Sequence, residues 1–246
     1  MHPVVAIYST FLNRGFDQLV MDVALTGQPV TIVLDRAGVT GSDGASHNGV
    51  WDMAITSLVP GVRVAAPRDG ARLRELFREA IEVEDGPTVV RFPKGNLLPD
   101  MEAVAELGDG VDVLHYSDVS ADEEGVGSDV LIVSIGVMSA RSLEAARTLE
   151  AEGYNVTVVD PRWVAPVPQS LIALADDHDV VVTVEDGIVR GGIGSMIEEA
   201  LSAAEVDTPL RRLGFPRVFP KHASRGELLA DVGLSPEGIA NSVREW

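Results

Sequence analysis

The chain has 246 residues, of which 46% are hydrophobic and 23% are charged, and this composition fits a globular protein of one or two domains rather than a disordered chain. Nineteen basic residues against 38 acidic ones give a formal charge of −19, which repels nucleic acids and anionic membrane surfaces. The sequence has no cysteine, which excludes disulfides and thiolate metal sites, and no apolar run approaches the roughly 20 residues that span a bilayer. We therefore expect a cytoplasmic protein with no nucleic-acid partner and no membrane partner.

Short runs of β-branched residues alternate with helical patterns in the first part of the chain, as is typical of an α/β fold. The predicted strands cover residues 4–8, 30–34, 62–66 and 88–92. Between the last two of these strands, apolar residues at helical spacing predict an amphipathic helix over residues 73–81.

The pattern breaks down after Asn96, and an acidic turn follows at residues 122–125. We interpret residues 98–126 as a linker between a first domain, 1–97, and a second domain, 127–246. The second domain repeats the alternation, so the sequence predicts two three-layer α/β domains. Its predicted strands are residues 129–135, 154–159, 180–184 and 210–214, and its predicted helices are residues 141–151, 169–176 and 195–204, with two short helices from residues 224 and 235.

The loop at residues 35–49 is the most informative segment, because a strongly apolar strand leads straight into glycines, an Arg, two Asp and a His. Ligands of parallel sheets collect beyond the carboxyl ends of the strands, and this loop follows such an end. One interpretation is a binding site. The other is a glycine-rich surface turn whose Asp and His cap a helix and whose Arg is solvated.

Two further strand ends carry residues that could bind a ligand. Tyr8, Phe11 and Arg14 follow the first strand, where an aromatic side chain could stack on a planar ring. The aromatic residues could equally belong to the core and the Arg could cap the sheet. Arg91 and Lys94 follow another strand on a bend fixed by a proline, where cations could hold a phosphate or pair with the abundant acids.

The glycine-rich segment 185–195 links another predicted strand to a helix start. Helix amino termini bind anions, but the local carboxylates argue against a phosphate, so we interpret the segment as structural, with Ser195 as the helix cap. His115, His178 and His222 lack neighbours at metal-ligand spacing, and we predict no metal site in this chain.

The motifs at the strand ends are Tyr8-Ser9-Thr10-Phe11-Leu12-x-Arg14, Asp35-Arg36-Ala37-Gly38, Gly41-x-Asp43-Gly44-x-x-His47-x-Gly49 and Arg91-Phe92-Pro93-Lys94-Gly95. In order and spacing they resemble the 1-deoxy-D-xylulose-5-phosphate synthase family of transketolase-like enzymes. The resemblance continues through residues 182–185 and 191–195 and covers nearly the whole chain. It implies a transketolase-like pyrimidine-binding domain followed by a transketolase carboxyl-terminal domain.

The resemblance also implies roles for single residues. Phe11 matches the aromatic residue that stacks on the aminopyrimidine ring of thiamine diphosphate, and His47 matches an active-site histidine placed for proton transfer. The residues that match those around the acceptor sugar phosphate are Tyr8, Arg36 and Asp43, together with Arg14 in the first motif and Lys94, where other members carry an Arg.

The implied reaction condenses pyruvate with glyceraldehyde 3-phosphate, with loss of carbon dioxide, at the entry to non-mevalonate isoprenoid synthesis and to thiamine and pyridoxal precursors. The family binds magnesium and the diphosphate in an amino-terminal domain, and its cofactor-activating glutamate precedes the strand at residues 4–8. Neither is matched here. The family binds magnesium and the diphosphate through a Gly-Asp-Gly motif, and we treat Gly108-Asp109-Gly110, which lies in the expected linker, as a chance match to it. We therefore expect a carboxyl-terminal fragment with an incomplete pyrimidine-binding domain, inactive alone, in a homodimer with the missing amino-terminal part of the enzyme.

Two other functions are left open. One is the pyrimidine-domain subunit of a thiamine-dependent oxo-acid dehydrogenase, whose partner chain would carry the diphosphate site. The motif at residues 8–14, with Arg36 and His47, favours the synthase over this subunit. The other is a non-catalytic assembly module that keeps the dimerisation surface.

Overall fold

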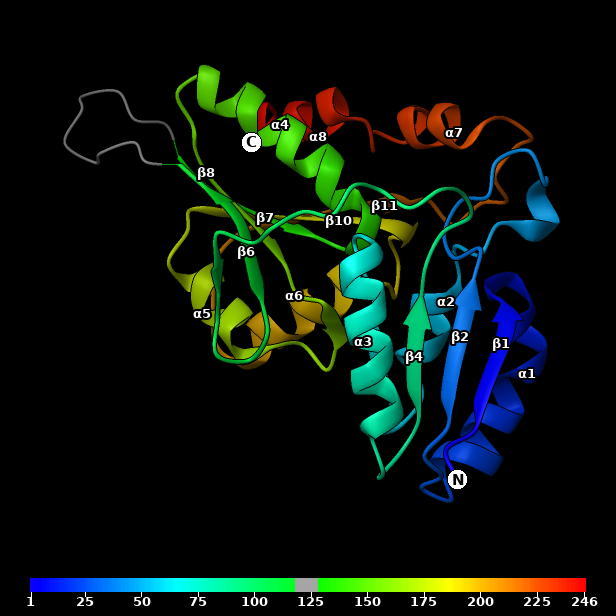
Figure 1. Cartoon of the computed structure of the whole chain (residues 1–246). Helices are drawn as coiled ribbons and strands as arrows, with labels where there is room; N and C mark the ends of the chain where they lie inside the picture. Colours follow the sequence, from blue (N-terminus) through cyan, green and yellow to red (C-terminus); the bar gives the residue numbers. More distant parts are fainter. Residues whose placement is uncertain (118–127) are drawn as a thin grey trace.

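The computed structural model describes residues 1–117 and 128–246, and in it two sheets each lie between layers of helices (Figure 1). The strand order is β1-β2-β4-β3-β9 in the first sheet and β11-β10-β7-β8-β6-β5 in the second. The prediction of two three-layer α/β domains is confirmed. The acidic turn expected at residues 122–125 lies outside the described residues.

The first sheet is built mainly from parallel strands, and both β2 and β4 are buried along most of their length. Its strands are β1 (Val4–Tyr8), β2 (Thr31–Asp35), β3 (Arg63–Ala65) and β4 (Thr88–Arg91). Its helices are α1 (Leu12–Gln18), which continues into a π-helical segment (Leu19–Ala24), α2 (Asp52–Thr56) and α3 (Gly70–Glu82). The sequence analysis predicted α3 but neither α1 nor α2, because α2 is little more than one turn and α1 contains a glycine.

The second sheet repeats this arrangement with longer elements. Its parallel strands are β7 (Asp129–Ser134), β8 (Asn155–Asp160), β10 (Val180–Ile188) and β11 (Leu210–Phe215). Helices α4 (Ser139–Ala151) and α8 (Pro236–Arg244) pack together on one face, and α5 (Gln169–Asp176) and α6 (Ile193–Ala203) on the other (Figure 1). A short helix, α7 (Arg225–Asp231), precedes α8 and lies above the end of the first sheet (Figure 1).

Part of the segment expected to be a linker belongs to the second sheet. Strand β6 (Asp112–Tyr116) pairs antiparallel with β8, and β5 (Ala105–Glu106) pairs antiparallel with β6. The side chain of Asp112 is buried and paired with Arg68. This part of residues 98–126 therefore belongs to the second sheet, where its strands make their backbone hydrogen bonds, while its buried carboxylate pairs with the first domain.

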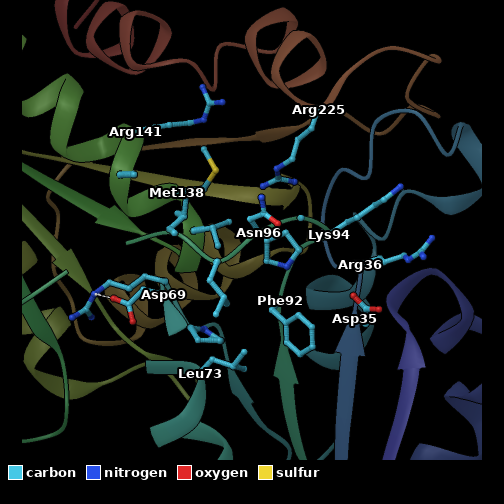
Figure 2. A pocket seen from close by; sticks show the side chains of 18 of the residues that line it. Asp35, Arg36, Asp69, Leu73, Phe92, Lys94, Asn96, Met138, Arg141 and Arg225 are labelled. Atoms are coloured by element: carbon cyan, nitrogen blue, oxygen red, sulfur yellow. Dashed lines mark ion pairs between the residues drawn. The ribbon is translucent and has the colours of Figure 1, made fainter. Parts of the chain in front are cut away.

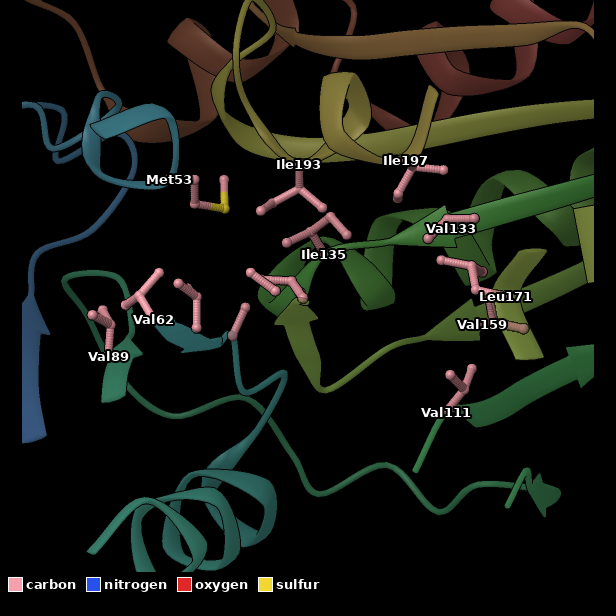
Figure 3. Packing of buried hydrophobic residues seen from close by; sticks show 14 of the residues in the cluster. Met53, Val62, Val89, Val111, Val133, Ile135, Val159, Leu171, Ile193 and Ile197 are labelled. Atoms are coloured by element: carbon pink, nitrogen blue, oxygen red, sulfur yellow. The ribbon is translucent and has the colours of Figure 1, made fainter. Parts of the chain in front are cut away.

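The two domains share strands and core. Strand β9 (Trp163–Ala165) leaves the second domain and pairs antiparallel with β3 at the edge of the first sheet. Figure 3 shows Met53, Val62 and Val89 of the first domain in the same apolar cluster as Ile135 and Ile193 of the second. Burial of such side chains stabilises by about 25 cal/mol per Å² of apolar surface, so this shared cluster fixes the first sheet against the second domain.

Candidate functional site

The ends of β1 and β2 bring two of the sequence motifs side by side. The strands are parallel, with Tyr8 opposite Asp35, so the chain leaves both strands at the same edge of the sheet. After β1 the chain makes a turn of 3₁₀ helix, from which Ser9 Oγ donates to the Gly49 carbonyl oxygen (3.1 Å). Thr10 Oγ1 likewise donates to the Ser46 carbonyl oxygen (2.9 Å). These hydrogen bonds join the first motif to the loop at residues 35–49.

Planar side chains from the two motifs are stacked beyond the strand ends. The Arg36 guanidinium lies over the Tyr8 ring, with its Cζ 4.1 Å from the ring centroid. The Tyr8 and Phe11 rings are nearly parallel, at 16° and a centroid separation of 6.0 Å. His47 meets Phe11 edge-on at 5.9 Å, and the Arg14 Cζ lies 5.9 Å from the Phe11 centroid. Tyr8 is exposed and Phe11 half-buried, so this is a surface of aromatic rings rather than core.

Charged side chains complete the group. Asp43 accepts from Arg36 Nη1 (3.0 Å) and from Lys94 Nζ (2.6 Å). The hydrogen bond from Lys94, aided by the charges of Lys94 and Arg36, lowers the pKa of the Asp43 carboxyl below its usual value. One carboxylate shared by two cations leaves positive charge facing solvent, which suits an anionic group. All the predicted site residues thus lie in one continuous set of contacts, and Asp43 pairs with cations instead of capping a helix.

The backbone of the loop is held in an unusual conformation where it leaves β2. Arg36 has a φ of +58°, a left-handed conformation that costs about 1–2 kcal/mol for a residue with a side chain. The next residue, Ala37, donates from its N–H to the Phe92 carbonyl oxygen (2.9 Å), and Gly38 and Gly49 exchange two backbone hydrogen bonds (3.1 and 2.7 Å). The surroundings therefore fix the direction of the Arg36 side chain.

A buried ion network lies beneath this loop. Arg91 binds Asp52 through Nε (2.7 Å) and Asp186 through Nη1 (3.0 Å), and Arg225 Nη2 binds the other oxygen of Asp186 (2.7 Å). Burial would raise the pKa of the Asp186 carboxyl, but the charges of Arg91 and Arg225 outweigh burial and lower it. The hypothesis that Arg91 could hold a phosphate is therefore wrong, since its guanidinium is only 3% exposed and already paired twice.

A cavity of about 800 Å³ opens at the junction of the two domains, beside the charged group. Arg36 and Lys94 line it from the first domain, and Arg141 and Arg225 from the second (Figure 2). Met138 and several leucines form apolar parts of the wall. The sequence analysis did not select Arg141 or Arg225, which lie on α4 and α7 and become neighbours of the first motifs only through folding.

The second glycine-rich segment is structural, as expected, but its cap differs. Glu185 is fully buried, and its carboxylate accepts from the N–H groups of Ile193 (3.1 Å) and Gly194 (2.9 Å) at the start of α6. The chain's own carboxylate thus takes the place of an external anion. Gly192 is the N-cap residue, while the Ser195 hydroxyl donates to the Val189 carbonyl oxygen (3.1 Å) within the loop.

The residues fit the aminopyrimidine ring of thiamine diphosphate better than they fit its diphosphate and the accompanying metal ion. The half-exposed aromatic surface of Tyr8 and Phe11 suits a planar ring such as an aminopyrimidine. Within residues 1–117 and 128–246 there is no group of three or more His, Asp or Glu side chains that could hold a metal ion. Over the same residues, no helix is long and apolar enough to cross a membrane.

Two protein-family models match the two domains of this chain. Residues 1–99 match the transketolase pyrimidine-binding domain, and residues 119–239 match the transketolase carboxyl-terminal domain. The chain therefore belongs to the transketolase family, whose members are thiamine diphosphate-dependent transferases.

The relatives that match over the full length of the chain are more specific. The chain is 60% identical over 245 residues to the 1-deoxy-D-xylulose-5-phosphate synthase of Corynebacterium glutamicum (strain R) and 56% identical over 246 residues to that of Mycolicibacterium gilvum (strain PYR-GCK). The resemblance to this synthase is thereby confirmed. In each case all of the chain is matched, and it spans 38% of the length of the relative.

Solved structures give the same fold. One described as a split gene transketolase, an inactive beta4 tetramer, superposes with a TM-score of 0.81 at 30% identity, covering 99% of this chain and 75% of that one. A transketolase mutant from Pichia stipitis superposes with a TM-score of 0.76 at 18% identity, covering 98% of this chain and 33% of that one, and supports the fold alone.

Proposed function

We propose that this chain supplies the pyrimidine-binding and acceptor side of a 1-deoxy-D-xylulose-5-phosphate synthase. That enzyme would condense pyruvate with glyceraldehyde 3-phosphate, with loss of carbon dioxide, in non-mevalonate isoprenoid synthesis. The observation that carries the proposal is the continuous set of contacts from Arg14 through Phe11 and Tyr8 to Arg36, Asp43 and Lys94 at one edge of the sheet. The identities of 54% and above to curated synthases support it.

In this proposal the bound thiamine diphosphate supplies the carbanion chemistry of the reaction. Phe11, which Tyr8 and Arg14 flank, would stack on its aminopyrimidine ring. Arg36 and Lys94 bind the phosphate of the acceptor, and Asp43 holds the two cations at one place. His47 moves a proton near the acceptor; its Nδ1 lies 3.0 Å from Ser46 Oγ, which leaves Nε2 to face the substrate.

Magnesium and the diphosphate would be bound by the amino-terminal part of the synthase, which the relatives carry in the 62% of their length beyond the match (100 − 38). We refer to this chain together with that part, in one polypeptide or two, as the assembled enzyme. We propose that it is a cytoplasmic homodimer. The 246-residue chain by itself is expected to be inactive and to bind thiamine diphosphate weakly, since stacking on an aromatic ring contributes only about 0.5–1.5 kcal/mol beyond area burial.

The test is an assay of pyruvate and glyceraldehyde 3-phosphate with thiamine diphosphate and magnesium, following the sugar phosphate product by mass spectrometry. The assembled enzyme is expected to form 1-deoxy-D-xylulose 5-phosphate, and this chain alone is not. Product from this chain alone would contradict the expected division of the site. No product from the assembled enzyme, with the fold verified by circular dichroism, would contradict the proposed function.

A further inference from the structure

The loop that carries Arg36, Asp43 and His47 rests directly on the carboxyl-terminal domain. At Gly41, whose φ is +79°, a Cβ atom would lie 2.6 Å from the backbone nitrogen of Arg225 at the start of α7. At Gly38 a Cβ atom would lie 2.1 Å from Asp186 Oδ2. Such approaches leave no room for water between the loop and the second domain, so the position of the loop depends on that domain.

The side chain of Arg225 joins the loop at residues 36–49 to the carboxyl-terminal domain. Its Nη1 donates to the Val39 carbonyl oxygen (2.7 Å), in the first part of the loop, and its Nη2 donates to Asp186 Oδ2 (2.7 Å). Asp186 is itself fully buried and bound to Arg91 on β4. The loop is therefore tied through one guanidinium to a carboxylate that is anchored in the core.

We infer that Arg225 is a positioning residue, which holds the loop at residues 36–49 in the conformation that the acceptor site needs; its effect on turnover rests on the proposed function. The left-handed backbone at Arg36 is strained and persists only while the surroundings hold it. The Val39 carbonyl lies three residues beyond that point and four before Asp43. Loss of the tie there would free Arg36 and Asp43 to move together.

The fork of an arginine is required for this role. Two nitrogen atoms on one rigid plane reach a carbonyl oxygen and a carboxylate oxygen at the same time. A lysine has a single nitrogen at the end of a flexible stem and could reach either acceptor, but would keep the charge opposite Asp186. Arg225→Lys should therefore retain part of the function, and Arg225→Gln should lose most of it.

The first measurement is hydrogen exchange, which does not depend on any activity. In the assembled enzyme, Arg225→Gln is expected to speed exchange of the Gly38 and Gly49 amides about ten- to a hundredfold, with a smaller effect for Arg225→Lys. Exchange in α4 should be unchanged. Arg217→Gln is the matched control, because Arg217 is an exposed arginine of the same domain, and it should leave the loop amides as they are.

The second measurement is steady-state kinetics on the same variants. Arg225→Gln is expected to raise KM for glyceraldehyde 3-phosphate and lower kcat, each by about tenfold, while KM for pyruvate changes less than threefold. Arg225→Lys should recover part of both losses, and Arg217→Gln should match the parent protein. A purely structural role would instead lower the amount of active enzyme without changing either KM.

Gly41→Ala gives an independent route to the same state, because the added methyl group pushes the loop away from α7. It should speed exchange at Gly38 and Gly49 even if Arg225→Gln does not fold. Loop amides that exchange at the parent rate in Arg225→Lys and in Gly41→Ala would overturn the inference. Faster loop exchange in these variants, when the assembled parent enzyme itself forms no sugar phosphate, would support the tie and contradict the proposed function instead.

Discussion

At the scale of single residues, variants of the candidate site can distinguish phosphate binding, proposed for Arg36, from proton transfer, proposed for His47. Arg36 is fixed by its stacking on Tyr8 and by its ion pair with Asp43, so its guanidinium faces the place proposed for the acceptor phosphate. Arg36→Ala in the assembled enzyme should raise KM for glyceraldehyde 3-phosphate, because a lost charged hydrogen bond costs about 1.5–3 kcal/mol. KM for pyruvate should change much less. Equal effects on both substrates, with the fold intact, would remove the phosphate role.

His47 is expected to give the opposite result. It touches Phe11 edge-on and Ser46 through Nδ1, and no phosphate role is assigned to it. His47→Ala should lower kcat by about a hundredfold or more if the imidazole transfers a proton, with a small change in either KM. His47→Gln is the matched variant, since it keeps a polar group but cannot change its protonation near pH 7. Turnover at the parent rate in both variants would contradict the role.

At the scale of elements, the loop after β2 depends on glycine where it meets the second domain. Gly38 has a φ of +69°, and a Cβ atom there would overlap the Asp186 carboxylate. Gly38→Ala should lower the free energy of unfolding by about 2–4 kcal/mol, measured by urea denaturation. Gly27→Ala is the control, because Gly27 has a φ of +63° but an added Cβ would meet no atom within 4 Å. It should show the backbone cost alone, about 1 kcal/mol. Equal losses in the two variants would contradict the close approach.

The junction of β10 and α6 predicts a pH dependence of stability. Burial raises the pKa of the Glu185 carboxyl from 4.5 to about 7, so the folded state holds this proton more tightly than the unfolded state. The resulting stabilisation is complete below about pH 4.5 and is lost as the pH rises through about 7. Asp160, whose burial raises its pKa to about 6, acts in the same direction.

Glu185→Gln tests this by removing the titrating group while keeping an amide oxygen for the N–H groups of α6. From pH 5 to pH 8 the parent protein should lose about 2–3 kcal/mol of unfolding free energy relative to the variant. Urea denaturation at the two pH values measures the difference. The same change with pH in both proteins would mean that Glu185 is ionised in the folded state throughout.

The elements also show which parts of the fold could be predicted from the sequence. Strands such as β2 and β10 are apolar, β-branched runs, and their burial follows from composition alone. Strand β9, three residues long, is a strand only because β3 lies beside it, and β6 depends in the same way on β8. No local pattern encodes a partner so far away in the chain.

The candidate site likewise contains some contacts that could be predicted from the sequence and others that could not. The contacts among Tyr8, Phe11 and Arg36 could be anticipated, because parallel strands deliver their following residues to one edge. The ties from Asp186 and Arg225 could not, since these residues lie more than a hundred positions from the loop. Arg91 is the last residue of β4, yet its side chain points inward, where it pairs with two buried carboxylates.

At the scale of the whole molecule, the two domains are joined by buried charge as well as by apolar packing. Arg68, from the segment before α3, is 1% exposed, and its Nη1 lies 2.5 Å from Asp112 on β6 and 2.8 Å from Asp160 on β8. The two carboxylates are fully buried, and burial raises the pKa of Asp160 to about 6 despite the guanidinium. The second domain therefore keeps its buried acids compensated by a residue of the first.

Arg68→Met should lower the free energy of unfolding by about 3–5 kcal/mol, because it leaves the buried carboxylate of Asp160 without its counter-charge and takes one of its cations from Asp112, which keeps Arg72 at 2.9 Å. Arg63→Met is the matched control: Arg63 pairs with Asp85 at 2.7 Å, but the pair is exposed, and its loss should cost about 0–1 kcal/mol. Urea denaturation of both variants measures the contrast. The loss in Arg68→Met should shrink at pH 5, where Asp160 takes up a proton and one of the uncompensated charges disappears. A loss that is the same at pH 5 and pH 8, or no larger than that of Arg63→Met, would show that apolar packing alone holds the domains together.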